Sequence, residues 1–392
     1  MKNTVSVTGE LLSDSQPVSD YDWPSDEPDL STTSLSVLNT SFRDELLREC
    51  SFYREFSADD FLKSYGNQTP LEQAIALLNH HAFQFNSKKR FRNSDAVQQS
   101  VKESLENGTP LDVVIPIFCV IGNKLKRFDP TVVTLAEECT LLALQRIADI
   151  FQQVIGLELR FQIISDALFY IRPLGSDPVV ASLYYKELCD YVDNHKLSNL
   201  TVHDMSLLPS NRLEEFEDAY LRLVKPLRED PGHGLEEGNH QSWLRSMAST
   251  ITTRDIPATY KEVEQTFRNH DFSTPFGQEV LSRTGRAFVD YRALKYALNE
   301  LHWDETHFPG SIRATIHQKK EPVLGLRVYP EYKRNSRLLP YHGVAVVKRG
   351  VDDNPVMEIA PEISVIGRER FKRFILPMGS TDLYIDTTSI EL

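Results

Sequence analysis

The sequence has few cysteines, and they lie far apart. Cys50, Cys119, Cys139 and Cys189 show neither C-x-x-C spacing nor the density of a disulfide-bonded scaffold, so we expect free thiols. Long hydrophobic runs are also missing, because no stretch approaches the roughly 18 apolar residues of a membrane helix. The polar start MKNTVSVTGE lacks the charged and apolar zones of a signal peptide. We therefore expect a cytoplasmic protein that does not bind membranes.

Positive charge is in short supply as well. The chain carries 43 Lys and Arg against 56 Asp and Glu, a formal net charge of −13. A non-specific nucleic-acid surface needs a cationic stripe that displaces counterions, so this composition argues against nucleic acid as a partner and leaves room only for a local basic pocket. The motifs G-x-G-x-x-G, G-x-x-x-x-G-K-[ST], G-x-S-x-G and H-E-x-x-H do not occur. Dinucleotide-binding motifs, P-loops, hydrolase elbows and this zinc motif are thereby not supported.

The apolar content, 41% of 392 residues, is enough for a substantial core. Residues 1–35 are rich in Ser, Thr, Asp and Pro, which predicts a disordered tail. We expect a first part of an α/β core over 36–210, a mainly helical segment over 211–308, and strands over 309–392 that complete the catalytic region.

The α/β expectation depends on local patterns. T-P-L-E from Thr69 has the N-cap, Pro and Glu that open a helix, which we expect to end near His80. LDVVIPIF, residues 111–118, is typical of a strand buried on both faces, although Pro116 cannot donate to a sheet and favours a strand end or a bulge there. A second capping box at Thr134 opens a long helix, and LELRFQII, residues 157–164, predicts the next strand. A strand, helix and strand in this order predict a parallel crossover.

The first group of candidate site residues follows these strands. The segment VIGNKLKRFDPT carries Lys124, Lys126 and Arg127 ahead of a helix start, where phosphate or carboxylate binding is physically sensible. The alternative is that these cations only solvate a surface loop. Ser165-Asp166 ends the second strand, where a carboxylate could orient an amine or act as a base, or where the pair could simply form a turn.

The second group lies on later strands. In SIRATIHQ the side chains of Arg313, Thr315 and His317 share one face of a strand, because side chains alternate with period two. On a cleft wall Arg313 could bind an anion and His317 could carry protons; on a solvated face the pattern means nothing. Arg327 and His342 follow, and a lone His at a strand start is more often structural. His317 with His342 is a weak metal signal, because no further ligand completes a recognisable spacing.

Taken in order, these segments resemble one known family. VVIPIFCVIGNKLKR, QIISDALFY, IRATIHQ, LGLRVYP and LLPYHGVAVV are similar to the pyoverdine/dityrosine biosynthesis family, whose characterised bacterial members are isonitrile synthases. The resemblance implies a Rossmann-like α/β core with helical additions. It also implies an enzyme that joins the amino group of an L-amino acid, commonly tyrosine or tryptophan, to ribulose 5-phosphate. These two small molecules are the implied partners, with a biosynthetic oxygenase acting downstream and no metal or redox cofactor.

The resemblance also suggests roles for individual residues. His317, Asp166 and Lys124 are the catalytic candidates, because forming an imine and cleaving a carbon–carbon bond both need proton transfers. The substrate-binding candidates are Lys126, Arg127, Ser165, Arg313, Arg327 and His342. The chain departs from the family in two places: the family's F-P-x-K-S-x-N is replaced by Phe118 followed by CVIGNK, and S-D-G by S-D-A. These changes leave two alternatives, a relative with a different amino-acid-derived product and a non-catalytic phosphosugar- or amino-acid-binding protein.

Overall fold

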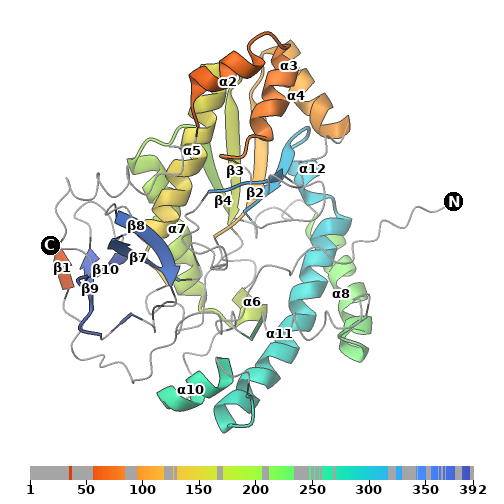
Figure 1. The fold of residues 1–392 in the computed structure, drawn as a ribbon. Coiled ribbons are helices and arrows are strands. Elements are labelled where there is room, and N and C mark those ends of the chain that lie inside the picture. The colour runs from red at the N-terminus through yellow and green to blue at the C-terminus, as the bar shows by residue number, and fades with distance from the viewer. Residues whose placement is uncertain are drawn as a thin grey trace.

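A computed structural model gives the fold of the chain (Figure 1). It describes residues 35–37, 56–83, 95–118, 127, 130–165, 171–204, 212–233, 247–248, 251, 256, 258–267, 271–316, 324–328, 341, 343–349, 355–360, 362, 365–366, 368–375 and 382–388. All statements about structure below concern these residues. Residues 1–34, most of the predicted tail, lie outside them.

A five-stranded sheet, parallel throughout, forms the centre of the molecule, which confirms the predicted α/β fold with a Rossmann-like core. In spatial order its strands are β4 (Leu200–Asp204), β3 (Leu159–Ser165), β2 (Leu111–Pro116), β5 (Ile312–Thr315) and β6 (Leu324–Gly325). Val113 of β2 lies opposite Phe161 of β3 on one side and Ile312 of β5 on the other. Strands almost 200 residues apart in the sequence therefore meet at the middle of the sheet.

Both faces of this sheet are covered by apolar side chains. Along β2, Val113 and Ile115 belong to one core cluster, whereas Val114 between them belongs to another. Alternate residues of a strand point to opposite faces, so both faces must be packed against helices. Pro116 is the last residue of β2, as its missing N–H predicted, and Ile117 continues the pairing by donating to the Ile164 carbonyl at 3.1 Å.

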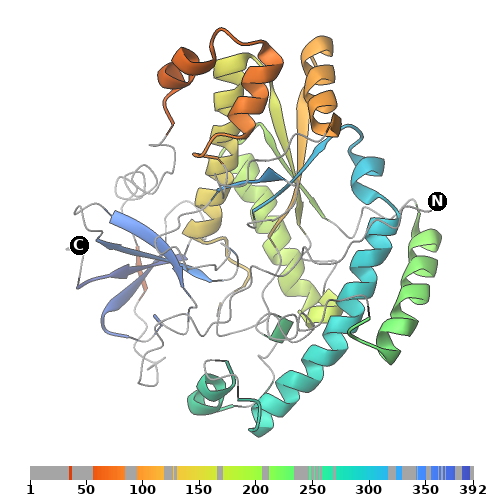
Figure 2. The ribbon, with the colours of Figure 1, turned by 45° about the vertical axis from the view of Figure 1, so that its right-hand side comes forward.

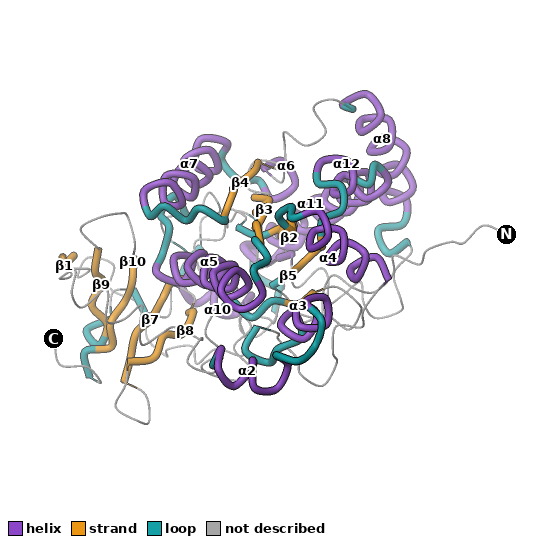
Figure 3. Tube along the Cα trace, turned by 90° about the horizontal axis from the view of Figure 1, so that it is seen from above, coloured by secondary structure: helices purple, strands orange, loops and turns teal. Residues whose placement is uncertain are grey.

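Helices cover the two faces, as Figures 2 and 3 show. The first face carries the helices α2 (Ala58–Tyr65), α3 (Pro70–Leu78), α4 (Asp95–Asn107), α5 (Leu135–Ile155) and α7 (Pro178–Asn194). The apolar cluster of the second face includes residues of α6 (Ile171–Leu174), α8 (Leu213–Glu229), α10 (Tyr260–Phe267), α11 (Pro275–Glu300) and α12 (Trp303–His307). Of these, α10 lies beside the start of α11 and away from the sheet (Figures 1 and 2). The helical middle of the sequence thus forms one layer of the fold.

The predicted helix starts are confirmed. Thr69 donates its N–H to Glu72 at 2.9 Å, and α3 ends at Leu78, two residues earlier than expected. The N–H of Thr134 donates to Glu137 at 2.7 Å where α5 begins. The helix α5 ends at Ile155 and is capped by Gly156, whose φ of 70° is in the left-handed region that glycine adopts without strain.

The C-terminal strands form a second, mixed sheet. Its order is β1 (Leu35–Val37), β9 (Phe371–Ile375), β10 (Asp382–Asp386), β7 (Val344–Arg349) and β8 (Pro355–Ala360). Ala345, Val347 and Ile385 of this sheet belong to the same core cluster as α5, so one of its faces packs toward the central fold. The last part of the sequence therefore contributes to both sheets, β5 and β6 to the first and β7 to β10 to the second.

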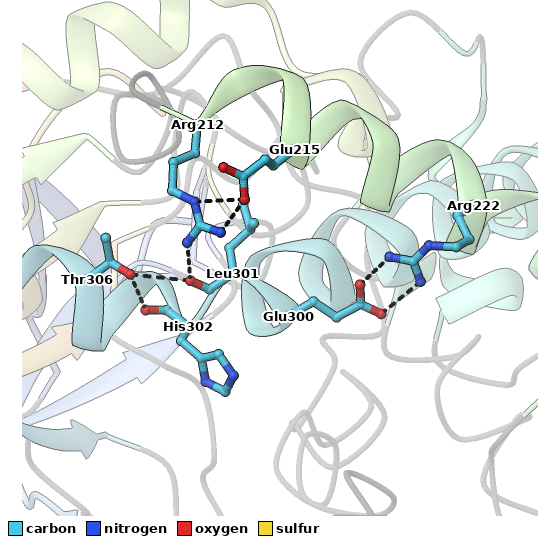
Figure 4. Close-up of polar contacts among 7 residues, drawn as sticks. All are labelled: Arg212, Glu215, Arg222, Glu300, Leu301, His302 and Thr306. Atoms are coloured by element: carbon cyan, nitrogen blue, oxygen red, sulfur yellow. Dashed lines mark hydrogen bonds and ion pairs between the residues drawn. The ribbon is translucent and has the colours of Figure 1, made fainter.

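Polar contacts fasten α8 to the end of α11, in addition to their apolar packing (Figure 4). The guanidinium of Arg222 donates to both carboxylate oxygens of Glu300, at 3.2 and 2.6 Å. Arg212, just before α8, donates to the carbonyl of Leu301 at 3.1 Å. The bond from Arg212 joins the start of α8 to the end of α11, so the two helices run antiparallel.

Candidate functional site

The carboxyl ends of the five parallel strands lie along one edge of the central sheet, and the chain changes direction there between β2 and β5. From β2 the chain adds β3 and β4 on one side, then returns to place β5 and β6 on the other. Ligands of open α/β sheets bind outside the carboxyl ends of the strands at such a switch point. The strands β2, β3 and β5, which adjoin the two groups of candidate residues in the sequence, therefore end next to one another at this edge.

The end of β2 is held by buried contacts. Ser165, at the end of β3, donates its hydroxyl to the carbonyl of Phe118 at 2.9 Å. Phe118 is fully buried and has a φ of 67°, a left-handed conformation that costs a non-glycine residue about 1–2 kcal/mol. Its ring meets that of Tyr341 edge-on, with centroids 5.9 Å apart. These contacts hold the strained backbone of Phe118, which immediately precedes the basic segment 119–126 of the sequence.

Arg127, which follows that basic segment, lies inside the protein with 1% of its surface exposed. Its Nη1 donates to Oε1 of Glu137 at 2.7 Å, and its Nη2 donates to the carbonyl of Val132. The hydroxyl of Tyr184, on α7, donates to the same Glu137 oxygen, and the guanidinium lies over the Tyr184 ring at 5.6 Å. A cation, a carboxylate and a phenol thus form one buried cluster.

The charges of this cluster balance one another. Burial by itself would lower the pKa of Arg127, but the nearby Glu137 carboxylate, Tyr184 and Glu362 outweigh it, so this pKa lies above its ordinary value. Glu362 follows β8 and accepts a hydrogen bond from the hydroxyl of Tyr384, on β10, at 2.8 Å. Glu362, which follows a strand of the second sheet, therefore contributes a negative charge that raises the pKa of Arg127.

Two more predicted site residues lie on β5 and just after β6. Arg313 and Thr315 share the sheet face opposite Ile312 and Ala314, as the alternation predicted. The guanidinium of Arg313 donates to Asp304 of α12 at 3.1 Å and lies over the Trp303 ring. Arg327 donates its backbone N–H to the Phe83 carbonyl at 2.8 Å, and its side chain is half-buried.

The structure thus places Ser165 of β3 against Phe118, which follows β2, Arg127 within the connection from β2 to α5, and Arg313 beside α12. Their predicted substrate contacts, and that of Arg327, stay predictions. The remaining candidates lie outside the described residues: Lys124, Lys126, Asp166, His317 and His342. Gly343, next to the last of these, packs so tightly that a Cβ there would lie 2.3 Å from the Ala360 oxygen.

A row of polar side chains across the second face of the sheet was not predicted. Gln162 of β3 donates its amide to Asp112 of β2 at 2.7 Å, and its carbonyl lies 2.7 Å from Nε2 of His203 on β4. Burial lowers the pKa of His203 and His307 adds to this effect, while the carboxylate of Asp112 opposes it. The only sequence signal for this row was the segment LTVHD, residues 200–204. Its apolar and polar side chains do not form a pattern that indicates a buried strand.

Asp204, also missed, is buried at the carboxyl end of β4. It neighbours Tyr185 of α7, where burial, with Cys189 and Asp204 contributing, raises the pKa of the phenol to about 12. Tyr185 therefore stays protonated at neutral pH. Asp204 occupies at the end of β4 the place that Ser165 occupies at the end of β3, with which it is paired in register.

Metal ligands and membrane helices were also sought among the described residues. No group of three or more His, Cys, Asp or Glu side chains there is arranged to hold a metal ion. Within the same ranges, no helix combines the length and the apolar character that crossing a membrane requires.

Comparisons with known proteins were made for the sequence and for the fold. Residues 101–358, more than half of the chain, match the family described as pyoverdine/dityrosine biosynthesis protein. No curated protein matches the sequence. The fold is similar to the crystal structure of the PvcA protein from Pseudomonas aeruginosa, with a TM-score of 0.57 and 15% identity, over 81% of this chain and 99% of that one. At that identity the likeness shows the fold, while the family match extends from α4 to β8 and includes both blocks of candidate residues. The chain therefore belongs to the pyoverdine/dityrosine biosynthesis protein family, a family of secondary metabolism.

Proposed function

We propose that this protein is an isonitrile synthase-like enzyme, which joins the amino group of an L-amino acid of the tyrosine or tryptophan type to ribulose 5-phosphate. The observation that carries the proposal is the family match over residues 101–358. Its support from the fold is the switch point between β2 and β5, the position where open α/β sheets bind anionic small molecules.

The chemistry matches the residue types that follow these strands in the sequence. An amine and the ketone of the sugar phosphate give an imine and one water, which requires a neutral amine and groups that transfer protons. We assign these transfers to Asp166, next after β3, and His317, two residues after β5. Lys124 is our third catalytic candidate.

The phosphate of the sugar requires cationic donors. We assign this contact first to Lys124 and Lys126, because the guanidinium groups of Arg127 and Arg313 already donate to carboxylates of the protein. Of the remaining candidates, Arg327 and His342 are kept as further substrate contacts.

A direct test supplies purified protein with ribulose 5-phosphate carrying ¹³C at every carbon, and with L-tyrosine or L-tryptophan. We expect mass spectrometry to find an isonitrile that contains one ¹³C atom, which comes from the sugar phosphate. The joint substitution of Lys124→Ala and His317→Ala should abolish it, whereas Lys372→Ala, on the exposed side of β9, should not. Activity retained by the double variant would contradict the site assignment.

The departures CVIGNK and S-D-A favour one second candidate, a family member with another nitrogen-containing product. A labelled product that is not an isonitrile would support that candidate. Binding of ribulose 5-phosphate by calorimetry without turnover would instead indicate a non-catalytic relative. If the protein neither binds nor converts either substrate, the proposed function is wrong.

A further inference from the structure

Arg127 is held more firmly than a residue of a solvated loop. Its guanidinium is 1% exposed, and the two terminal nitrogens donate to different groups, Glu137 and the carbonyl of Val132. Its flat face lies over the Tyr184 ring. An anionic substrate that used the same nitrogens would have to displace these partners and leave the buried Glu137 carboxylate without its cation.

Glu137 connects this arginine to the start of α5. One carboxylate oxygen accepts from Arg127 and Tyr184, and the other accepts the N–H of Thr134 at 2.7 Å. Glu137 itself is fully buried. The position of Arg127 is therefore tied to the first turn of the helix and, through Tyr184, to α7.

The opposite end of the same connection is fixed independently. Phe118 is anchored by Ser165 and by the ring of Tyr341, which lies in the segment leading to β7. The connection from β2 to α5 is thus held at two buried residues, Phe118 and Arg127. Phe118 contacts Tyr341, and Arg127 lies close enough to Glu362 for that carboxylate to raise its pKa. Such support is what keeps a binding site in a productive geometry.

We infer that Arg127 is a positioning residue: its buried pairing with Glu137 and Tyr184 fixes Arg127 itself and the first turn of α5, on the chain that leads from β2 and carries the proposed phosphate contacts. This replaces the sequence-based prediction that Arg127 binds substrate. The effect on substrate rests on the proposed function, whereas the structural effect does not.

The test separates positioning from stability with two variants. Arg127→Met leaves Glu137 charged and buried, and it should lower the melting temperature. Adding Glu137→Gln removes that charge and should recover much of the stability, without restoring the forked arginine contact. We expect the double variant to keep a roughly ten- to hundredfold raised KM for ribulose 5-phosphate, with a smaller change in KM for the amino acid. Arg127→Lys keeps the charge but not the forked contact, so its KM for ribulose 5-phosphate should lie between those of the wild type and the double variant.

Arg292 supplies the matched control. It is 2% exposed on α11, donates to the carbonyls of Pro231 and His233 at 2.6 and 2.7 Å, and lies over the Phe288 ring. Arg292→Lys should lower the melting temperature while both KM values stay at the wild-type level. Equal increases of KM in Arg292→Lys and Arg127→Lys would mean that only general stability is involved, which overturns the inference. A wild-type KM in the stabilised double variant would overturn it as well.

Hydrogen exchange gives a reading that does not depend on activity. In the double variant, peptides containing Phe118 to Thr134 should exchange faster than in the wild type, while peptides of β9 and β10 should not change. Unchanged exchange in the first set would refute the positioning role. Faster exchange in a protein that forms no product from any amino acid would support the positioning role and reject the proposed function.

Discussion

Two buried charged residues, Asp386 and Arg292, are held by particular neighbours. Asp386, fully buried on β10, accepts from Arg370 at 2.9 Å and from Thr388, and these bonds, outweighing burial, hold the pKa of its carboxyl below its usual range. Arg292 is bound by backbone carbonyls instead of a carboxylate. Removing one partner of such a group leaves a desolvated charge, which typically costs about 3–5 kcal/mol.

His203 is the titratable residue for which the structure predicts a pH effect on stability. Its pKa is lowered in the folded protein, so the unfolded chain binds more protons as the pH falls below about 6.5. Stability should therefore decrease as the pH falls from that value through the folded pKa. His203→Gln keeps an amide donor for Gln162 and cannot be protonated, so its urea midpoint should fall less than that of the wild type between pH 7.5 and pH 5.5.

Exposed His233 provides the comparison, because it lies at the surface after α8. His233→Gln should retain the wild-type dependence on pH. If His203→Gln loses as much stability on acidification as the wild type does, the half-buried row from Asp112 to His203 is not the source of the effect.

The sequence indicated local partners of buried residues, but not distant ones. Glu137 was predicted at the start of α5 because a capping box is set by residues three positions apart. Its bond to Tyr184 joins residues 47 positions apart and exists only after α7 packs beside α5. The sequence therefore predicted that Arg127 is either solvated or bound to substrate, because nothing near it in the sequence predicts burial.

Among the elements, the helices α8 and α11 are joined both by buried apolar contacts and by a surface ion pair. Leu227 and Val224 of α8 are 3% and 4% exposed and pack against Val289 and Ala293 of α11. The Arg222–Glu300 pair lies at the surface, with side chains 62% and 41% exposed, where water and salt screen it.

We therefore expect Leu227→Ala to lower the free energy of unfolding by about 2–5 kcal/mol, since it opens a cavity between the two helices. Arg222→Ala should cause no measurable change. Urea denaturation followed by circular dichroism checks both variants. A larger loss in Arg222→Ala than in Leu227→Ala would show that the ion pair, and not the apolar contact, holds α8 in place.

The elements that could be predicted are those whose own sequence has a clear apolar pattern. The strand β2 was predicted because its sequence is almost uniformly apolar, and both of its faces are buried. In β3, Leu159, Phe161 and Ile163 are buried, whereas Arg160 is exposed. The strand β9, FKRFI, alternates with exposed Lys372, and its pairing with β10 and β1 is decided by segments that are distant in sequence. Such strands need tertiary partners before their pattern has a meaning.

On the scale of the whole molecule, the two sheets share one apolar core. Leu383 and Ile385 of β10 are fully buried in the same cluster as α5 and the first face of the central sheet. The sequence predicted C-terminal strands but not their division, because only the return of β5 to a place beside β2 shows where the central sheet ends. That return also places the end of β5 beside the end of β2.

A shared core predicts that the two sheets unfold together. Ile385→Ala should remove about 2–5 kcal/mol by leaving a cavity between the second sheet and α5. All described helices lie outside the second sheet, so circular dichroism at 222 nm reports the rest of the fold. We expect its urea midpoint to fall in step with the exchange protection of β7 and β10. Lys372→Ala, on an exposed position of the same sheet, should change neither. A helical signal that keeps its wild-type midpoint while β7 and β10 lose protection would show instead that the second sheet unfolds independently.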